Sequence, residues 1–188
     1  ESSSLDFSSS TNKMMVCLED FRLGTEYDIY CKYYDFDANL LSDEIALATQ
    51  ENTPIDSNQN SPFVYATQTG TFLVVWEDNR NDDGVYSDLY FQEMSHCDYF
   101  LQDGGDLLCD ADFDQLNPRI DVYNESDNSY VIYWDDLRSS GKEFLNNIFA
   151  QSYTSNNGAD DVCSEVVLGD INFDGLVNVL DVVNLVNS

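Results

Sequence analysis

Residues 71–80 read Thr-Phe-Leu-Val-Val-Trp-Glu-Asp-Asn-Arg, an apolar run that ends in an aromatic residue, two acids and an arginine. The same pattern occurs at residues 129–138 and, with Leu in place of Trp, at residues 14–22. Leu18 lies 58 positions before Trp76, and Trp76 lies 58 positions before Trp134. Three copies at one spacing indicate an internal repeat, and such a repeat predicts a fold built from similar structural units.

Each copy has strand-like neighbours. A second apolar run follows each copy after a short polar loop, at residues 28–32, 88–92 and 147–151. A lead containing Pro precedes the second and third copies, at residues 60–64 and 117–120. Short β-branched and aromatic runs bounded by Asn, Asp, Gly and Ser predict antiparallel strands. Weaker candidates for a fourth strand lie at residues 44–49 and 162–167.

Four antiparallel strands in a repeat of about 40 to 60 residues are typical of a β-propeller blade. Over roughly residues 11–160 the sequence resembles secreted bacterial β-propeller repeats whose blades carry a Trp-x-Asp-x-Arg corner. The resemblance implies an all-β fold with three four-stranded, blade-like repeats. We expect one repeat domain over residues 1–165, with units near 1–58, 59–116 and 117–165.

Three blades do not close a propeller, which typically has about four to eight. The counterpart of the Pro lead in the first unit falls near Leu5, where the surrounding sequence is mostly serine. We therefore expect about two and a half blades. Either the chain is a fragment of a longer protein, or several copies complete one another in a closed oligomer or a filament.

The repeated corner has a physical interpretation. Residues two apart in a strand share a face, so Trp76 and Asp78 point the same way, and Arg80 can pair with Asp78 at the end of the strand. Three of the four arginines of the chain occupy this position. They are either ligand-binding arginines or parts of a structural corner, and we favour the structural interpretation. The corner residues are Asp20, Arg22, Trp76, Asp78, Arg80, Trp134, Asp136 and Arg138.

Residues 170–181 have the spacing of a calcium loop. Oxygen-bearing side chains fall at loop positions 1, 3, 5, 9 and 12, with Gly at position 6, where a sharp turn is needed. Position 7 offers a backbone carbonyl. The pattern predicts Ca²⁺ binding by Asp170, Asn172, Asp174, Leu176, Asn178 and Asp181.

The last segment, residues 166–188, resembles one calcium-binding repeat of a dockerin, the module that joins secreted proteins to cohesin partners. Polar residues follow the loop every third position, and the rest of the segment is apolar. We expect a short helix that packs either on its own repeat domain or on another protein. Its apolar docking face consists of Val179, Val182, Val183 and Val186.

Composition excludes several functions. The 188 residues include 36 acidic and 7 basic side chains, a net charge of −29 at pH 7. Nucleic-acid binding needs a basic surface, so this balance argues against nucleic acid as a partner. No apolar run approaches the roughly 18 residues of a membrane span. The single histidine, His96, argues against a His-based metal site or catalytic triad.

The five cysteines include no Cys-x-x-Cys pair, which argues against a zinc or redox motif. Cys17 and Cys31 lie on consecutive predicted strands, and Cys97 and Cys109 flank a predicted turn at residues 103–106; either pair could form a disulfide. With the strong acidity, this favours an extracellular protein. A second calcium site at Asp110, Asp112 and Asp114 is an alternative to a solvated acidic loop.

We predict a secreted, non-enzymatic structural or adhesion protein that binds copies of itself, with the calcium loop and helix as docking element. The alternative is a module that binds carbohydrate or protein, as part of a larger dockerin-bearing propeller protein. A cohesin-like protein or a glycan would then be the partner. An enzyme such as a glycoside hydrolase fragment is a third class, for which no catalytic residues stand out.

Overall fold

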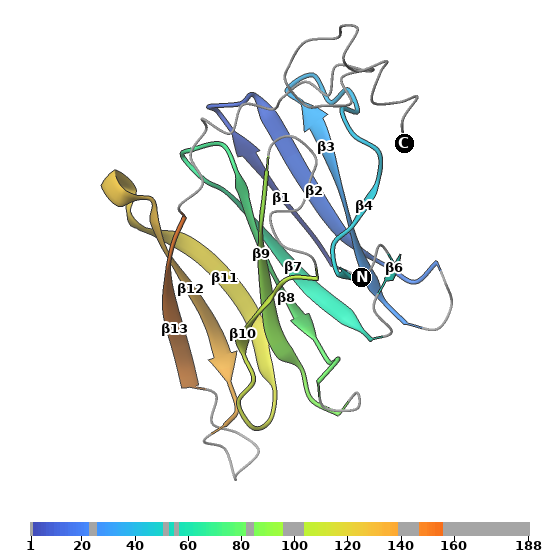
Figure 1. Ribbon diagram of the computed structural model, residues 1–188, viewed down its shortest axis with the longest axis vertical. Helices are drawn as coiled ribbons and strands as arrows, with labels where there is room; N and C mark the ends of the chain where they lie inside the picture. The colour runs from blue at the N-terminus through green and yellow to red at the C-terminus, as the bar shows by residue number, and fades with distance from the viewer. Residues whose placement is uncertain are drawn as a thin grey trace, which may run out of the picture.

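The computed structural model describes residues 2–22, 26–50, 53–54, 57–81, 85–95, 104–138 and 147–155. Within them the fold is all-β, and a 3₁₀ turn at Glu125–Asp127 is the single helical element. Figure 1 shows three antiparallel sheets that lie face against face in chain order. The predicted all-β fold of blade-like antiparallel repeats is confirmed.

The first sheet has the strand order β1 (Ser3–Ser8), β2 (Lys13–Asp20), β3 (Asp28–Asp35) and β4 (Ile45–Ala46). The middle sheet follows the same order with β7 (Gln59–Ala66), β8 (Phe72–Asp78), β9 (Asp88–Met94) and β10 (Asp106–Cys109). The third sheet contains β11 (Gln115–Asn124), β12 (Ser129–Asp136) and β13 (Asn147–Thr154). A small hairpin of β5 (Thr49–Gln50) and β6 (Thr53–Pro54) connects the first two sheets.

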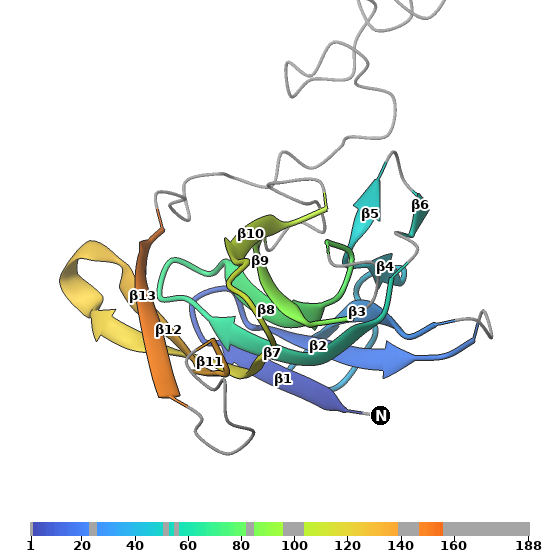
Figure 2. The ribbon, with the colours of Figure 1, turned by 90° about the horizontal axis from the view of Figure 1, so that it is seen from below.

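The first strands of the three sheets, β1, β7 and β11, are neighbours in space, with β7 in contact with both others (Figure 2). We call them the inner strands. The predicted Pro leads at residues 60–64 and 117–120 belong to β7 and β11. The predicted fourth strand at 44–49 contains β4, whereas the candidate at 162–167 lies outside the described residues.

Two apolar layers hold the sheets together. One lies between the first and middle sheets and includes Met15, Ile29, Val74 and Trp76. The other lies between the middle and third sheets and is formed by Leu73, Val75, Phe91, Ile120, Tyr130 and Ile132. Strands β8 and β9 are buried along their whole length, because the middle sheet is covered on both faces.

The serine-rich N-terminus corrects one expectation. The first unit was expected to lack its leading strand, but Ser3–Ser8 forms β1 and pairs with β2 from Lys13 to Leu18. The Ser2 N–H also donates to the Glu19 carboxylate at 2.7 Å. The first unit is therefore a complete four-stranded sheet, and its own second strand holds the N-terminal segment in place.

The predicted disulfide between Cys17 and Cys31 is confirmed, and it joins directly paired positions of β2 and β3. Cys109 has a free thiol, and its suggested partner Cys97 lies outside the described residues.

Removing the disulfide is expected to destabilise the protein. The two cysteines are 14 residues apart, and closing a loop of that length stabilises a fold by about 3 kcal/mol. The double variant Cys17→Ser/Cys31→Ser should lose about 2–4 kcal/mol in urea unfolding. Cys109→Ser serves as control, since it removes a thiol without breaking a crosslink. Equal midpoints for the double variant and wild type would contradict the expectation.

Candidate functional site

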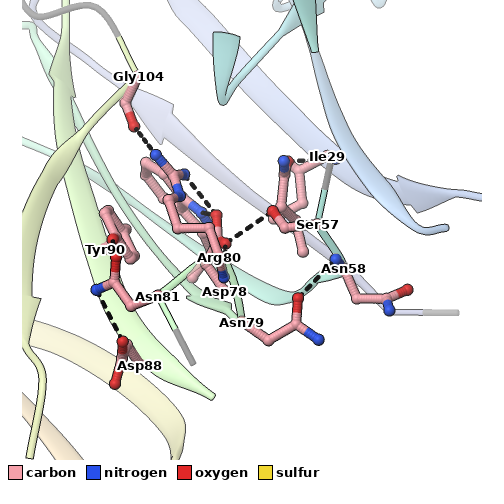
Figure 3. Close-up of polar contacts among 12 residues, drawn as sticks. Ile29, Ser57, Asn58, Asp78, Asn79, Arg80, Asn81, Asp88, Tyr90 and Gly104 are labelled. Carbon is pink, nitrogen blue, oxygen red and sulfur yellow. Dashed lines mark hydrogen bonds and ion pairs between the residues drawn. The ribbon is translucent and has the colours of Figure 1, made fainter. Parts of the chain in front are cut away.

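The repeated corner forms a closed hydrogen-bonded unit, shown for the middle sheet in Figure 3. Trp76 Nε1 donates to Asp78 Oδ2 at 3.1 Å, and Arg80 Nη2 donates to the same oxygen at 2.5 Å. The third sheet repeats this arrangement, with 3.0 Å from Trp134 Nε1 and 2.5 Å from Arg138 Nη2 to Asp136 Oδ2. In the first sheet, where Leu18 replaces the tryptophan, Arg22 pairs with Asp20 and also with Glu44.

Each corner arginine also stacks on an aromatic ring of the following strand. The guanidinium carbon lies 4.1 Å from the ring centre of Tyr30 for Arg22, 3.9 Å from Tyr90 for Arg80 and 4.2 Å from Phe149 for Arg138. Hydrogen bonding to Asp136 raises the pKa of Arg138. Each of the three arginines thus contacts an aspartate and an aromatic ring of its own sheet.

Hydrogen bonds between neighbouring sheets also repeat. In β7 and β11 the pairing register shifts at a bulge, where Ser61 and Asn117 adopt left-handed backbone conformations with φ of 52° and 55°. The Ser61 N–H donates to Glu19 Oε1 at 2.7 Å, and the Asn117 N–H donates to Glu77 Oε1 at 2.8 Å. Each bulge thus binds the acid that precedes the corner aspartate of the previous sheet.

Two glutamines extend this connection. The Gln59 N–H donates to the Tyr27 carbonyl, and the Gln115 N–H donates to the Ser87 carbonyl, both at 2.8 Å. Each glutamine belongs to an inner strand, and each carbonyl precedes the third strand of the previous sheet. The two inter-sheet junctions therefore use equivalent backbone hydrogen bonds.

Glu19 and Glu77, the two carboxylates that accept the bulge N–H groups, have pKa values shifted in opposite directions. Burial raises the pKa of Glu77, and the hydrogen bonds from Asn117 and Ser61 only partly offset this effect. Burial also acts on Glu19, but hydrogen bonds from Ser2 and Ser61 outweigh it, so its pKa is lowered.

The raised pKa of Glu77 predicts a pH effect on stability. The folded protein binds this proton more tightly than the unfolded chain, so the stabilisation is complete below about pH 4.5 and is lost as the pH rises through the folded pKa. Glu77→Gln keeps an oxygen for the Asn117 N–H and removes the titration. The variant should gain stability relative to wild type as the pH rises above 4.5. Urea midpoints of both proteins at several pH values would show a constant difference if this is wrong.

A pocket of about 350 Å³ opens where the three inner strands begin. We call it the inner-strand pocket, and its lining residues are Ser2, Ser3, Ser4, Ser61, Pro62, Phe63, Asn117 and Arg119. The Arg119 guanidinium lies 5.2 Å from the ring centre of Phe63 and donates one hydrogen bond to the Pro118 carbonyl. Of the four arginines of the chain it is the one outside the repeated corners, and among the described residues it forms no ion pair.

Sequence reasoning missed this pocket. Its walls come from segments about 60 residues apart that meet only through the packing of β1, β7 and β11. One signal was available, because Arg119 is the one arginine outside the corner position.

The predicted metal sites are placed as follows. The calcium loop at residues 170–181, the docking face at Val179–Val186 and His96 lie outside the described residues. Asp114 accepts a hydrogen bond from the Ser87 N–H at 3.0 Å and so takes part in the inter-sheet junction. In the part of the chain that the structure describes, no three His, Cys, Asp or Glu side chains are close enough together to hold a metal ion. Asp110, Asp112 and Asp114 therefore do not form such a group.

No protein-family model and no curated protein matches the chain. Among solved structures it is similar to an endo-arabinase from Bacteroides thetaiotaomicron, with a TM-score of 0.49 and 13% identity over 83% of this chain and 56% of the other. It is also similar to the Penicillium chrysogenum α-L-arabinanase complexed with arabinobiose, with a TM-score of 0.45 and 13% identity over 79% and 43%. The chain thus spans about half the length of these structures.

Both similar structures are enzymes. The sequence-based prediction of a non-enzymatic structural or adhesion protein that self-associates is therefore wrong. At 13% identity the similarity concerns the fold, and it assigns no role to any residue of this chain. Among the described residues there is also no helix long and apolar enough to cross a membrane.

Proposed function

We propose that this protein binds a saccharide in the inner-strand pocket. The observation that carries the proposal is Arg119, an arginine that lines this pocket and has no ion pair in the described part of a chain with a net charge of −29. The other arginines are held by aspartates of their own corners. Arg119 therefore keeps most of its donors for a ligand.

The lining suits a sugar. Small-molecule pockets have volumes from about 300 Å³ upwards and combine apolar surface with a few polar groups that fix orientation. Here Phe63 and Pro62 supply apolar surface, while the Ser3 hydroxyl and the side-chain carbonyl of Asn117 supply polar groups. The hydroxyls of Ser2, Ser4 and Ser61 are hydrogen-bonded within the protein, to Glu19, Val64 and Glu77. A guanidinium presents a planar fork of donors that matches pairs of ligand oxygens. Vicinal hydroxyls of a sugar ring offer such pairs.

The charge of the protein narrows the ligand class. Thirty-six acidic side chains create a negative field that disfavours anionic ligands such as phosphates or uronates. Glu19 and Glu77 lie directly behind the pocket wall, where they hold Ser61 and Asn117. We therefore expect a neutral saccharide.

Replacing Arg119 is expected to abolish most of the binding. Arg119→Gln removes the charged fork and should weaken the affinity for a neutral oligosaccharide by at least about tenfold, since hydrogen bonds to charged groups contribute about 1.5–3 kcal/mol. Calorimetric titration with a panel of soluble neutral oligosaccharides, arabino-oligosaccharides among them, measures this. Arg22→Gln is the matched control, because it removes the same charge at a partly exposed corner. Equal affinities of Arg119→Gln and wild type, or no binding by wild type, would refute the proposal.

Glycoside hydrolysis is a second candidate, favoured by the opposite pKa shifts of Glu19 and Glu77, which accept the N–H groups of the pocket residues Ser61 and Asn117. Glycosidases use one protonated and one ionised carboxyl group, and their environments separate the two pKa values. Glu77 would act as the acid and Glu19 as the ionised partner. Release of reducing sugar by wild type but not by Glu77→Gln, with binding retained in the variant, would support this candidate.

Two further proposals come from the sequence. Residues 170–181 bind Ca²⁺, and a cohesin-like protein is the partner that the dockerin resemblance suggests. Secretion is supported by the Cys17–Cys31 disulfide, because such bonds persist in oxidising compartments. Calcium titration of wild type and Asp174→Ala tests the loop.

A further inference from the structure

The outer face of the third sheet differs from the equivalent faces of the other two. Aligning Trp134 with Trp76 and Leu18 places four third-sheet residues, Val131, Tyr133, Ile148 and Ala150, in register with apolar positions of the other sheets. Those positions are at most 6% exposed in the middle sheet (Leu73, Val75, Leu89, Phe91) and fully buried in the first (Met15, Cys17, Ile29, Cys31). Yet Tyr133 is 37% and Ile148 is 77% exposed.

The next sheet is what buries these positions in the first two sheets. The layer over Met15, Cys17, Ile29 and Cys31 is completed by the middle sheet, and the layer over Leu73, Val75 and Phe91 is completed by the third. No described segment covers the third sheet in this way (Figure 1). The third face, which contains Asp121, Tyr133, Asp135 and Ile148, therefore continues an interface that the protein already builds twice.

The acids on this face repeat the pattern of the first sheet. There, Asp6 Oδ1 accepts from the Phe7 N–H while its Oδ2 accepts from the Ala66 N–H of the next sheet, both at 2.8 Å. Asp121 occupies the position of Asp6, and its Oδ1 accepts from the N–H of the next residue, Val122, at 2.8 Å, as Asp6 Oδ1 does from Phe7. Its Oδ2 is thereby placed to accept a backbone N–H from a further sheet.

Asp135 occupies the position of the two bulge acceptors. Glu19 and Glu77 accept the N–H of a left-handed bulge residue of the following sheet, at Ser61 and Asn117. Asp135 Oδ2 accepts from the Asn117 side chain, as a neighbour within its own sheet. The two acceptors of the first sheet, Glu19 and Asp6, bind N–H groups of the middle sheet. These N–H groups belong to residues 61 and 66, five residues apart on the edge of β7 that pairs with no strand of its own sheet.

We propose that the third face binds a further blade of the same repeat type, whose inner strand carries a left-handed bulge before a proline. Asp135 accepts the N–H of the bulge residue and Asp121 accepts the N–H five residues later. The apolar side chains Tyr133 and Ile148 pack against the face of that blade. The occupant is a repeat unit from polypeptide outside residues 1–188.

A second copy of this chain does not fit these requirements. The surface it would offer is its first sheet, whose inner strand β1 pairs with β2 from Ser3 to Ser8 without a register shift. The Ser2 N–H at the bulge position is already bonded to Glu19 of the same sheet. Strand β1 therefore lacks the bulged N–H that Asp135 is placed to accept.

The test uses the purified protein and a labelled peptide with the sequence of residues 57–67, which contains the Ser61–Pro62 bulge of β7. Fluorescence anisotropy should show saturable binding. Asp121→Ala and Asp135→Ala should each weaken it by about tenfold, because each removes a charge-assisted hydrogen bond. Asp37→Ala, which removes an exposed acid in the turn after β3, should have no effect. A peptide of residues 2–12, which lacks the bulge, should bind at least tenfold more weakly.

Three results would overturn the proposal. They are the absence of saturable binding up to about millimolar peptide, equal binding of a scrambled peptide, and equal affinities of wild type and both aspartate variants. Light scattering of the protein alone tests the competing occupant. A concentration-dependent dimer that Asp135→Ala abolishes would assign the face to a second copy and would refute the proposed blade.

Discussion

Asp78→Ala is expected to remove about 3–5 kcal/mol of folding stability, a large part of the roughly 5–15 kcal/mol typical of a domain. The Asp78 side chain is fully buried and accepts hydrogen bonds from Trp76, Arg80 and Ser57. Its loss leaves a guanidinium that is only 14% exposed without its counter-charge and a buried indole N–H without an acceptor. Urea unfolding followed by tryptophan fluorescence measures the effect.

The repeat supplies matched controls for this variant. Asp136→Ala removes the equivalent carboxylate where the arginine is 34% exposed, so water replaces part of the lost interaction and the loss should be smaller. Asp20→Ala acts at a corner where the aspartate is 25% and the arginine 40% exposed, and its effect should be the smallest of the three. Equal losses in the three variants would show that burial does not determine the strength of the corner.

Gly105→Ala is expected to destabilise the protein by about 2–4 kcal/mol, from backbone strain and overpacking together. Gly105 has a φ of +73°, and a Cβ atom there would lie 2.8 Å from Cζ2 of Trp76 and 3.2 Å from the Phe91 carbonyl. Trp76 cannot retreat, because it is fully buried and its Nε1 is bound to Asp78. The Gly104 carbonyl accepts a hydrogen bond from Arg80 at 2.9 Å, so the backbone next to Gly105 is also held in place.

A double-mutant cycle distinguishes the steric effect from backbone strain. If the methyl group of Gly105→Ala collides with the indole, adding Trp76→Phe should recover part of the loss, giving a coupling of about 1 kcal/mol. Gly70→Ala is the control: its φ is +93°, but its nearest neighbour, 2.5 Å away, is the terminal methyl of the partly exposed Thr11. Strict additivity of the two substitutions would mean that strain alone is responsible.

The blade-like sheets follow from local sequence because the 58-residue repeat and the alternation within each strand are both visible in the chain. The pairing of Cys17 with Cys31 also follows, since the two lie on consecutive strands. Strand β1 was not predicted, because serine has little intrinsic preference for strands. Its place depends on long-range contacts, such as the Val64 N–H that donates to Ser4 Oγ at 3.0 Å.

The candidate pocket depends even more on tertiary structure. Ser61 and Asn117 adopt left-handed conformations because a bulge and an acid of the previous sheet hold their N–H groups, and neither cause is local. Arg119 becomes a candidate ligand-binding residue only when β1, β7 and β11 come together. The stacking of Arg80 on Tyr90 could have been predicted from the sequence, since an aromatic residue occurs at the same place in the third strand of each unit: Tyr30, Tyr90 and Phe149.

The bulge-and-acid junction bears on how such a chain can evolve. The middle unit carries both halves of the junction, a donor at Ser61 near its start and an acceptor at Glu77 on its second strand. A duplicated copy of that unit could therefore form the same bulge-to-acid hydrogen bonds with the units before and after it, without new contacts. Gene duplication and deletion can in this way change the number of sheets one unit at a time, while selection acts on each unit separately. The divergence of Leu18 from Trp76 and Trp134 is the kind of drift that such independence permits.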